Sequence, residues 1–180
     1  MRRIGWLAAG IAALACGGKL FTIGIDGTAV TVVQEGTIVE AFLGELGFEE
    51  LATVEIADSE ELANQGVEPG DIREVVLTDF VLTAKMPQGA DLSFLDRVDV
   101  FVEGPGLPRV LIATSSSFPA GQAEVVFEVT EADITDYATA EFLTVTTEAE
   151  GRSPDQDTTI EAFYLIDVGV TAQGCRAGTD

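Results

Sequence analysis

The chain has 180 residues, with 31 acidic against nine basic side chains and a formal net charge of −22. Such an acidic surface repels nucleic acid and anionic membrane surfaces, because both are recognised through basic patches. The hydrophobic fraction of 47% excludes a disordered acidic chain, and the absence of histidine excludes every site that needs an imidazole.

The first predicted element is an export signal over residues 1–15. Arg2 and Arg3 form a basic start, and an uncharged run of twelve residues follows from Ile4 to Ala15. This run is too short to cross a bilayer, which takes about 20 apolar residues. A basic start, a short apolar run and small residues before the cleavage point are typical of a segment that directs export and is then removed.

The segment Ala12-Ala13-Leu14-Ala15-Cys16 resembles a bacterial lipoprotein signal. The resemblance implies that Cys16 becomes the lipid-modified first residue and anchors the chain to the membrane. In a Gram-negative host, Gly17 after the cysteine resembles the pattern sorted to the outer membrane. Lipoprotein signals prefer leucine three places before the cysteine, where this chain has Ala13. The end of the segment also fits the A-x-A site of ordinary signal peptidase, which would release a soluble protein.

Cys16 and Cys175 are the only two cysteines. A lipid on the Cys16 sulfur leaves Cys175 unpaired, whereas ordinary cleavage permits a disulfide that joins the two chain ends. Removing residues 1–15 leaves seven basic and 31 acidic side chains, a net charge of −24. We expect residues 16–19 to form a short tether and residues 20–180 to form a single domain.

Short strands are predicted along the first half of the domain. Asp26-Gly27 is a strong hairpin-turn signal between two apolar runs. Glu35-Gly36 marks the next turn, and Asp58 with Glu61 resembles a capping box that opens a short helix. The predicted strands span residues 21–25, 28–33, 37–43, 52–56 and 72–86.

The strand over 72–86 is the longest of these and is apolar on both faces, which is typical of a central strand. Strict alternation places one set of its apolar residues on one face: Val76, Phe80, Leu82, Ala84 and Met86. It places another set on the opposite face: Val75, Leu77 and Val81.

The second half continues the strand pattern. One helical turn is predicted over 91–95 with Asp91 as its cap. The stretch Thr130–Asp133 resembles a capping box, and the residues that follow it to Ala140 are predicted to form a short helix or a crossover. The predicted strands span residues 98–102, 110–114, 123–129, 142–147 and 160–170, with a polar loop over 148–157. The last strand has the clearest period-two alternation in the chain.

Eight to ten short strands, separated by Gly, Pro and Asp turns, predict an all-β fold. We expect a single antiparallel β-sandwich, immunoglobulin-like or jelly-roll in type, with short helices in the crossovers.

Catalytic groups are scarce in this sequence. No histidine is present to serve as a base, both cysteines are near the ends, and the run Thr114–Ser117 has no lysine near it in sequence. Paired carboxylates are the one remaining catalytic device, and the mature chain has no tryptophan to form a sugar-stacking groove beside them. We therefore expect no enzyme, and a carboxylate-based hydrolase is the least favoured function.

Calcium is the one cofactor with some basis, because carboxylates and loop carbonyls are its usual ligands. Asp155 and Asp157 lie two residues apart in a predicted loop and are the candidate metal ligands. Asp133 and Asp136 form a second candidate pair. Neither pair has the full spacing of an EF-hand loop, and the ordinary reading of such residues is a solvated turn.

The sequence thus predicts a non-enzymatic lipoprotein of the cell envelope that presents a β-sandwich for binding or assembly. Its membrane contact would be the lipid on Cys16, and its protein or glycan partner is unknown. The alternative is an adhesin-like or carbohydrate-recognising module, with calcium as a possible requirement.

Overall fold

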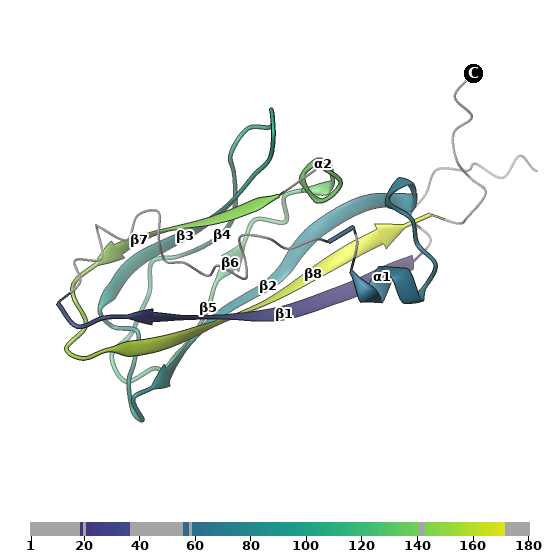
Figure 1. The fold of residues 1–180 in the computed structure, drawn as a ribbon. Helices are drawn as coiled ribbons and strands as arrows, with labels where there is room; N and C mark the ends of the chain where they lie inside the picture. The colour runs from purple at the N-terminus through teal and green to yellow at the C-terminus, as the bar shows by residue number, and fades with distance from the viewer. Residues whose placement is uncertain (1–18, 20, 37–55, 58, 141–142, 172–180) are drawn as a thin grey trace, which may run out of the picture.

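The structure is a computed structural model that describes residues 19, 21–36, 56–57, 59–140 and 143–171. Two four-stranded antiparallel sheets pack face to face (Figure 1), which confirms the all-β sandwich. Sheet 1 has the order β1 (Phe21–Val33), β8 (Thr158–Val170), β2 (Ile72–Met86), β5 (Glu124–Val126). Sheet 2 has the order β6 (Glu128–Val129), β4 (Val110–Ser115), β3 (Leu95–Glu103), β7 (Thr144–Gly151). Short helices lie in the connections: α1 (Glu60–Asn64), the 3₁₀ helix η2 (Pro69–Asp71) and α2 (Thr135–Ala138).

Strand β8 lies between β1 and β2 in sheet 1. Its alternating sequence predicts that one of its two faces is buried. It pairs with β1 from Phe21↔Val170 to Val33↔Thr158 and with β2 on its other side. The side chains that point into the sandwich include five buried residues: Ile160, Ala162, Ile166, Val168 and Val170. The prediction for this strand is confirmed.

Strand β2 has the predicted bounds and the predicted interior position, but its buried face combines members of both predicted sets, namely Val75, Leu77, Phe80, Leu82 and Ala84. The pairing with β8 shifts in register between Leu77 and Asp79, so a β-bulge at Thr78 changes the phase of the alternation. The Thr78 hydroxyl donates to the carbonyl of Leu165 at 3.2 Å. As a result, Leu77 before the bulge and Phe80 after it are both buried.

The predicted turn at Asp26-Gly27 is wrong, because β1 runs through both residues without a break. Gly27 pairs with Tyr164 of β8, and a Cβ at Gly27 would overlap the Tyr164 hydroxyl and ring. The glycine is therefore explained by the ring that covers it and not by a turn. Pairing along all of β8 outweighs the local turn preference of the dipeptide.

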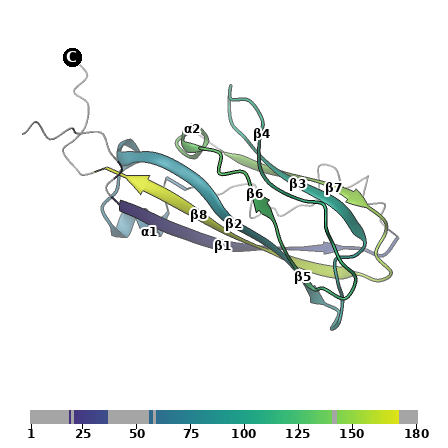
Figure 2. The same ribbon diagram turned by 180° about the vertical axis from the view of Figure 1, so that it is seen from behind.

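The predicted strand over 123–129 is divided between the two sheets. Glu124–Val126 pairs with β2 in sheet 1, and Glu128–Val129 pairs with β4 in sheet 2. Phe127 lies at the transition, is buried, and packs edge-on against Phe80 with ring centroids 5.0 Å apart. Figure 2 shows the chain passing from β5 to β6 between the sheets.

Three predicted helix starts need correction. Ser59, not Asp58, caps α1, and its hydroxyl accepts from the Leu62 amide at 3.4 Å. Residues 92–94 form a bend and a turn in place of the helical turn predicted over 91–95. Helix α2 starts after Asp133, because the Thr130 hydroxyl donates to the Leu111 carbonyl of β4 instead of capping the helix.

Other boundaries differ or lie outside the described residues. Strand β7 continues through Glu148 to Gly151, which the sequence assigns to a loop. The strands predicted over 37–43 and 52–55, the residue Cys16 and the residue Cys175 all lie outside the described part of the chain. Ile56, at the end of the second of these predicted strands, is buried.

The Gly27–Tyr164 contact predicts an unusual response to a small substitution. Gly27→Ala should lower the free energy of unfolding by about 1–3 kcal/mol, because the new methyl group displaces the Tyr164 ring. In a Tyr164→Leu background the same change should cost less than about 0.5 kcal/mol, because alanine is favoured over glycine within a strand. Urea denaturation measures both values.

The matched control is Gly24→Ala in the same strand, where a Cβ would lie 3.5 Å from the Leu165 Cδ1 atom, an ordinary contact. Gly24→Ala should be neutral or stabilising. An equal cost for Gly27→Ala with and without the Tyr164 ring would contradict the explanation.

Candidate functional site

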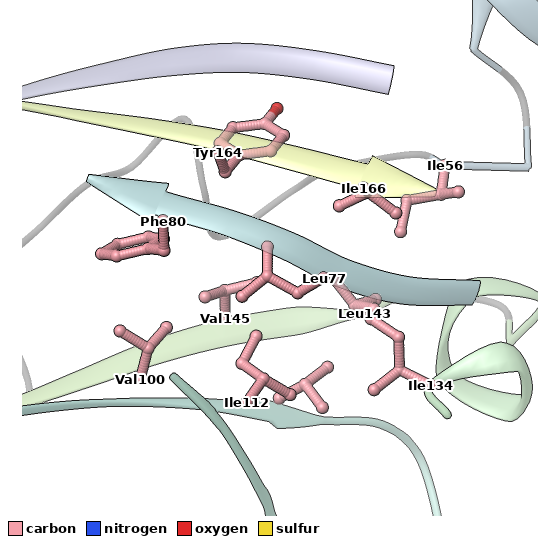
Figure 3. A pocket seen from close by; sticks show the side chains of 11 residues that line it. Ile56, Leu77, Phe80, Val100, Ile112, Ile134, Leu143, Val145, Tyr164 and Ile166 are labelled. Atoms are coloured by element: carbon pink, nitrogen blue, oxygen red, sulfur yellow. The ribbon is translucent and has the colours of Figure 1, made fainter. Parts of the chain in front are cut away.

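The interior of the sandwich offers little space among the described residues. A cavity of about 30 Å³ lies between the sheets, with apolar side chains such as Leu77, Val100 and Ile134 around it (Figure 3). Among the described residues that line it, the Tyr164 hydroxyl is the one polar side-chain group. Such a volume holds about two water molecules, and an apolar lining keeps it dry. The described core therefore serves packing, and binding has to be sought on the surface.

The loops at one end of the sandwich form the most connected surface feature. Strand β1 runs from Phe21 to Val33, a length of about 40 Å at the usual rise of a strand. Four segments gather at its Val33 end, away from the start of the domain at Lys19 (Figure 1, left). We call these segments the loop end, and they are residues 34–36, 87–94, 116–123 and 152–157.

Asp91 links two of these segments. Its Oδ2 accepts from the Gly121 amide at 2.6 Å, and its Oδ1 accepts from the Ser93 amide at 3.0 Å. These bonds, first the one from Gly121 and then those from Ser93, lower the pKa of the Asp91 carboxyl below its ordinary value. The carboxylate thus stabilises the arrangement as long as it is ionised.

Arg152 and Asp157 connect the remaining segments. The Arg152 guanidinium donates to the Ser93 carbonyl at 2.8 Å, and the Arg152 amide donates to the Phe94 carbonyl at 2.8 Å. Asp157 Oδ1 accepts from the Glu35 amide at 2.8 Å. Together with Asp91, these contacts join all four segments into one hydrogen-bonded surface.

Two recesses open on or beside this surface. The first, which we call the loop recess, has a volume of about 210 Å³. Its polar lining side chains are Asp91, Ser93, Arg152, Ser153, Asp155, Gln156 and Thr158. The second, which we call the edge groove, has a volume of about 410 Å³ and extends from the loop end along the side of the sandwich. Its lining residues are Thr114, Ser115, Ser116, Ser117, Pro119, Gln122, Glu124, Val125, Val126 and Glu128.

The predicted calcium residues fall at the loop end but have separate roles. Asp155 is exposed and lines the loop recess, where Arg152 places a positive charge among the lining groups. Asp157 is exposed and accepts the bond from Glu35. Within the described residues, no three acidic or cysteine side chains come together as a metal site. Calcium binding at Asp155 and Asp157 stays a prediction.

The second candidate pair lies elsewhere. Asp133 Oδ1 accepts from the amide of Thr135 at 3.0 Å and from its hydroxyl at 2.5 Å, so this carboxylate orders the start of α2. Asp136 lies in that helix and is exposed. The pair is at the end of the sandwich away from the loop end.

The serine run that the sequence assigns to a polar loop lines the edge groove. Ser115 is the last residue of β4 and Ser116 and Ser117 follow it, whereas Glu124 and Val126 come from β5 in the other sheet. The groove therefore exists because the chain changes sheets at Phe127. No local pattern in the sequence signals this juxtaposition, since it depends on where two sheets separate.

The outer face of sheet 2 is occupied by its own charged network. The Arg109 guanidinium lies 3.7 Å from the ring centre of Phe101 and 3.0 Å from Glu103, and it also pairs with Glu148. These groups are partly exposed, so each pair contributes only modestly to stability. Their side chains are engaged with one another, which leaves the loop end and the edge groove as the better candidates for binding.

The comparisons with known proteins do not name a family. The chain matches no protein-family model, and no curated protein matches it. None of the helices in the described ranges is long and apolar enough to span a membrane.

The Asp91 contacts predict a pH-dependent contribution to stability. Asp91→Asn should lower the free energy of unfolding by about 1 kcal/mol at pH 7, because it removes charge-assisted bonds at a partly exposed site. Since the folded pKa lies below the unfolded value, the contribution is complete above about pH 4 and is lost as the pH falls further. Denaturation of both proteins between pH 7 and pH 2 should show the two curves converging at low pH.

Asp96→Asn provides the matched control, because Asp96 is exposed at the start of β3 and accepts no bond from the described residues. It should leave stability within about 0.5 kcal/mol. A constant difference between wild type and Asp91→Asn across the whole pH range would rule out this role for the ionised carboxylate.

Proposed function

We propose that this protein is a non-enzymatic, lipid-anchored protein of the cell envelope that uses its β-sandwich to bind or assemble with a partner. The observation that carries the proposal is the loop end, where Asp91, Arg152 and Asp157 join four segments at the far end of the domain from Lys19. A rigid set of loops on a sheet scaffold is a common design for recognition, because binding residues are held by the strands beneath them.

The proposed anchor explains the direction in which the domain faces. Three residues beyond Cys16 the chain reaches Lys19, a span of at most about 11 Å. The lipid would thus hold the Phe21 end of β1 near the membrane, and the loop end would lie about 40 Å farther out. In a Gram-negative host this membrane would be the outer membrane.

Charge supports the same orientation. The mature net charge of −24 repels anionic headgroups, so the domain would not lie flat on such a surface. Lys19, the first basic residue after Cys16, pairs with Glu74 at 2.6 Å and is thereby partly neutralised. The lipid, and not the protein surface, would supply the membrane affinity.

An adhesin-like or carbohydrate-recognising module is the second candidate. The loop recess favours it, because Ser93, Arg152 and Gln156 offer donors and acceptors of the kind that bind sugar hydroxyls.

A requirement for calcium would be visible as a rise of several degrees in melting temperature at millimolar calcium. Asp155→Asn/Asp157→Asn should lose that rise, and an unchanged wild-type melting temperature would refute calcium dependence.

The anchor is tested by the intact mass of the protein isolated from the membranes of its host. We expect a diacyl- or triacyl-modified Cys16 as the first residue and a free thiol at Cys175. Cys16→Ser should lose the lipid and the membrane association, and Cys175→Ser should keep both.

The opposite result is equally clear in the same spectrum. An unmodified chain that begins at Cys16, with Cys16 and Cys175 oxidised to a disulfide, would overturn the anchor and favour a soluble exported protein.

A further inference from the structure

Strand β5 leaves one side of its backbone unpaired by the described residues. Its bonds to β2 include Ala84 N–H to the Ala123 carbonyl at 2.7 Å and Phe127 N–H to the Phe80 carbonyl at 2.9 Å. In an antiparallel pair such bonds recur at every second residue, so Val125 also faces β2. The amides and carbonyls of Glu124 and Val126 then point away from β2, toward the open edge of sheet 1.

The edge groove lies directly beside this open edge. Glu124, Val125 and Val126 form one wall, and Ser115–Ser117 with Glu128 form the opposite wall from sheet 2. Its volume of about 410 Å³ is within the range of ligand sites. A strand edge that faces such a space is a template for backbone pairing with an added segment.

We propose that the edge groove binds an extended peptide segment that carries a basic residue, and that this segment adds to sheet 1 as a strand beside β5. The inference names the class of partner for the proposed binding function and rests on that function. It does not depend on the lipid anchor. The partner's backbone would pair with Glu124 and Val126, and its side chains would alternate between the outer face and the interior of the groove.

The charge and shape of the groove favour this partner. Glu124 and Glu128 are the charged side chains of the lining, and no basic residue is among the described residues that form it. On the outer face, Val126 is 62% exposed and continues in register into Val81 and Phe163. A basic side chain would therefore lie beside Glu124, and an apolar one beside Val126.

Two other occupants fit less well. A sugar usually stacks on an aromatic ring, and the described residues that line the groove include none. A second copy of this chain would bring another net charge of −22 to a groove that is already acidic. An extended basic peptide meets both the free backbone groups and the charge.

The probe is a fluorescein-labelled peptide, Thr-Val-Thr-Lys-Thr-Val-Thr, mixed with the full chain in detergent micelles. Its symmetry places lysine beside Glu124 and valine beside Val126 in either strand direction. We expect a dissociation constant of about 1 mM or tighter, as a few backbone hydrogen bonds would provide. The amide signals that shift in NMR spectra should be those of residues 114–117 and 123–128.

A peptide with N-methyl groups on all of its internal amides is the first control, since it keeps the side chains but has no amide on either edge that can pair along a strand. It should bind at least about tenfold more weakly. Because the protein is unchanged in this comparison, the result does not depend on the folding of a variant. Equal binding of the two peptides would overturn strand addition.

Protein variants provide the second comparison. Val126→Pro removes the amide that faces the groove, so one backbone hydrogen bond to the peptide is lost and binding should weaken about tenfold. The variant should still fold, because proline is tolerated at a free strand edge. Val126→Thr keeps that amide and should bind like wild type. Glu124→Gln/Glu128→Gln should weaken binding several-fold at low salt and reduce its salt dependence. Unchanged binding by Val126→Pro or by the double variant would contradict the proposal.

The remaining outcomes separate this inference from the anchor. A concentration-dependent dimer that disappears in Val126→Pro, without peptide binding, would overturn the proposal and assign the edge to a second copy. A lipid on Cys16 with no peptide binding would overturn the peptide site alone. Peptide binding by a chain with an unmodified Cys16 would overturn the anchor and support the site.

Discussion

Strand β8 pairs with β1 on one side and with β2 on the other, and this double pairing sets the register of sheet 1. Each residue of β1 has a partner in β8, and β2 covers the other side of β8 with three shifts in register. Because alternate residues of β8 face the core, its register also decides which side chains of β1 and β2 are buried. A shift of one residue would expose Ile166 and Val168 and would bury Asp167.

The passage of the chain from sheet 1 to sheet 2 at Phe127 determines what the surface can do. Sheet 1 ends in a strand of only three residues, β5, and the chain then joins β4 in the other sheet. The Phe80 and Phe118 rings pack edge-on against Phe127 and hold the transition in place. The short edge strand and the separated end of β4 leave the edge groove between them. Packing at the core and the proposed binding site at the surface thus have the same cause.

The sequence predicts the regular part of the fold well, because period-two alternation is a direct consequence of burial on one face. The sequence predicts strands at the positions of β8, β2, β3 and β4. Local signals failed where distant residues decide the outcome. Asp26-Gly27 has the sequence of a turn, but the turn is overridden by pairing with β8 and by the Tyr164 ring.

The candidate site was less predictable than the fold for a related reason. Asp91, Gly121, Arg152 and Ser93 come from loops that are far apart in sequence, and their contacts require the assembled sandwich. The serine run in residues 115–117 carries no signal of the groove that it lines. Asp155 and Asp157 were correctly placed in a strand-connecting loop, but Asp157 bonds to the Glu35 amide, a role that spacing alone does not reveal.

Amide hydrogen exchange, resolved by residue in NMR spectra of the full chain, tests whether sheet 1 ends in an open edge at β5. We expect the slowest exchange for β8, because its amides are bonded to strands on both of its sides. We also expect alternation within β5, with protected amides at Val125 and Phe127 and fast exchange at Glu124 and Val126. Equal protection of all four amides would show that the edge is already paired and would contradict the proposed site.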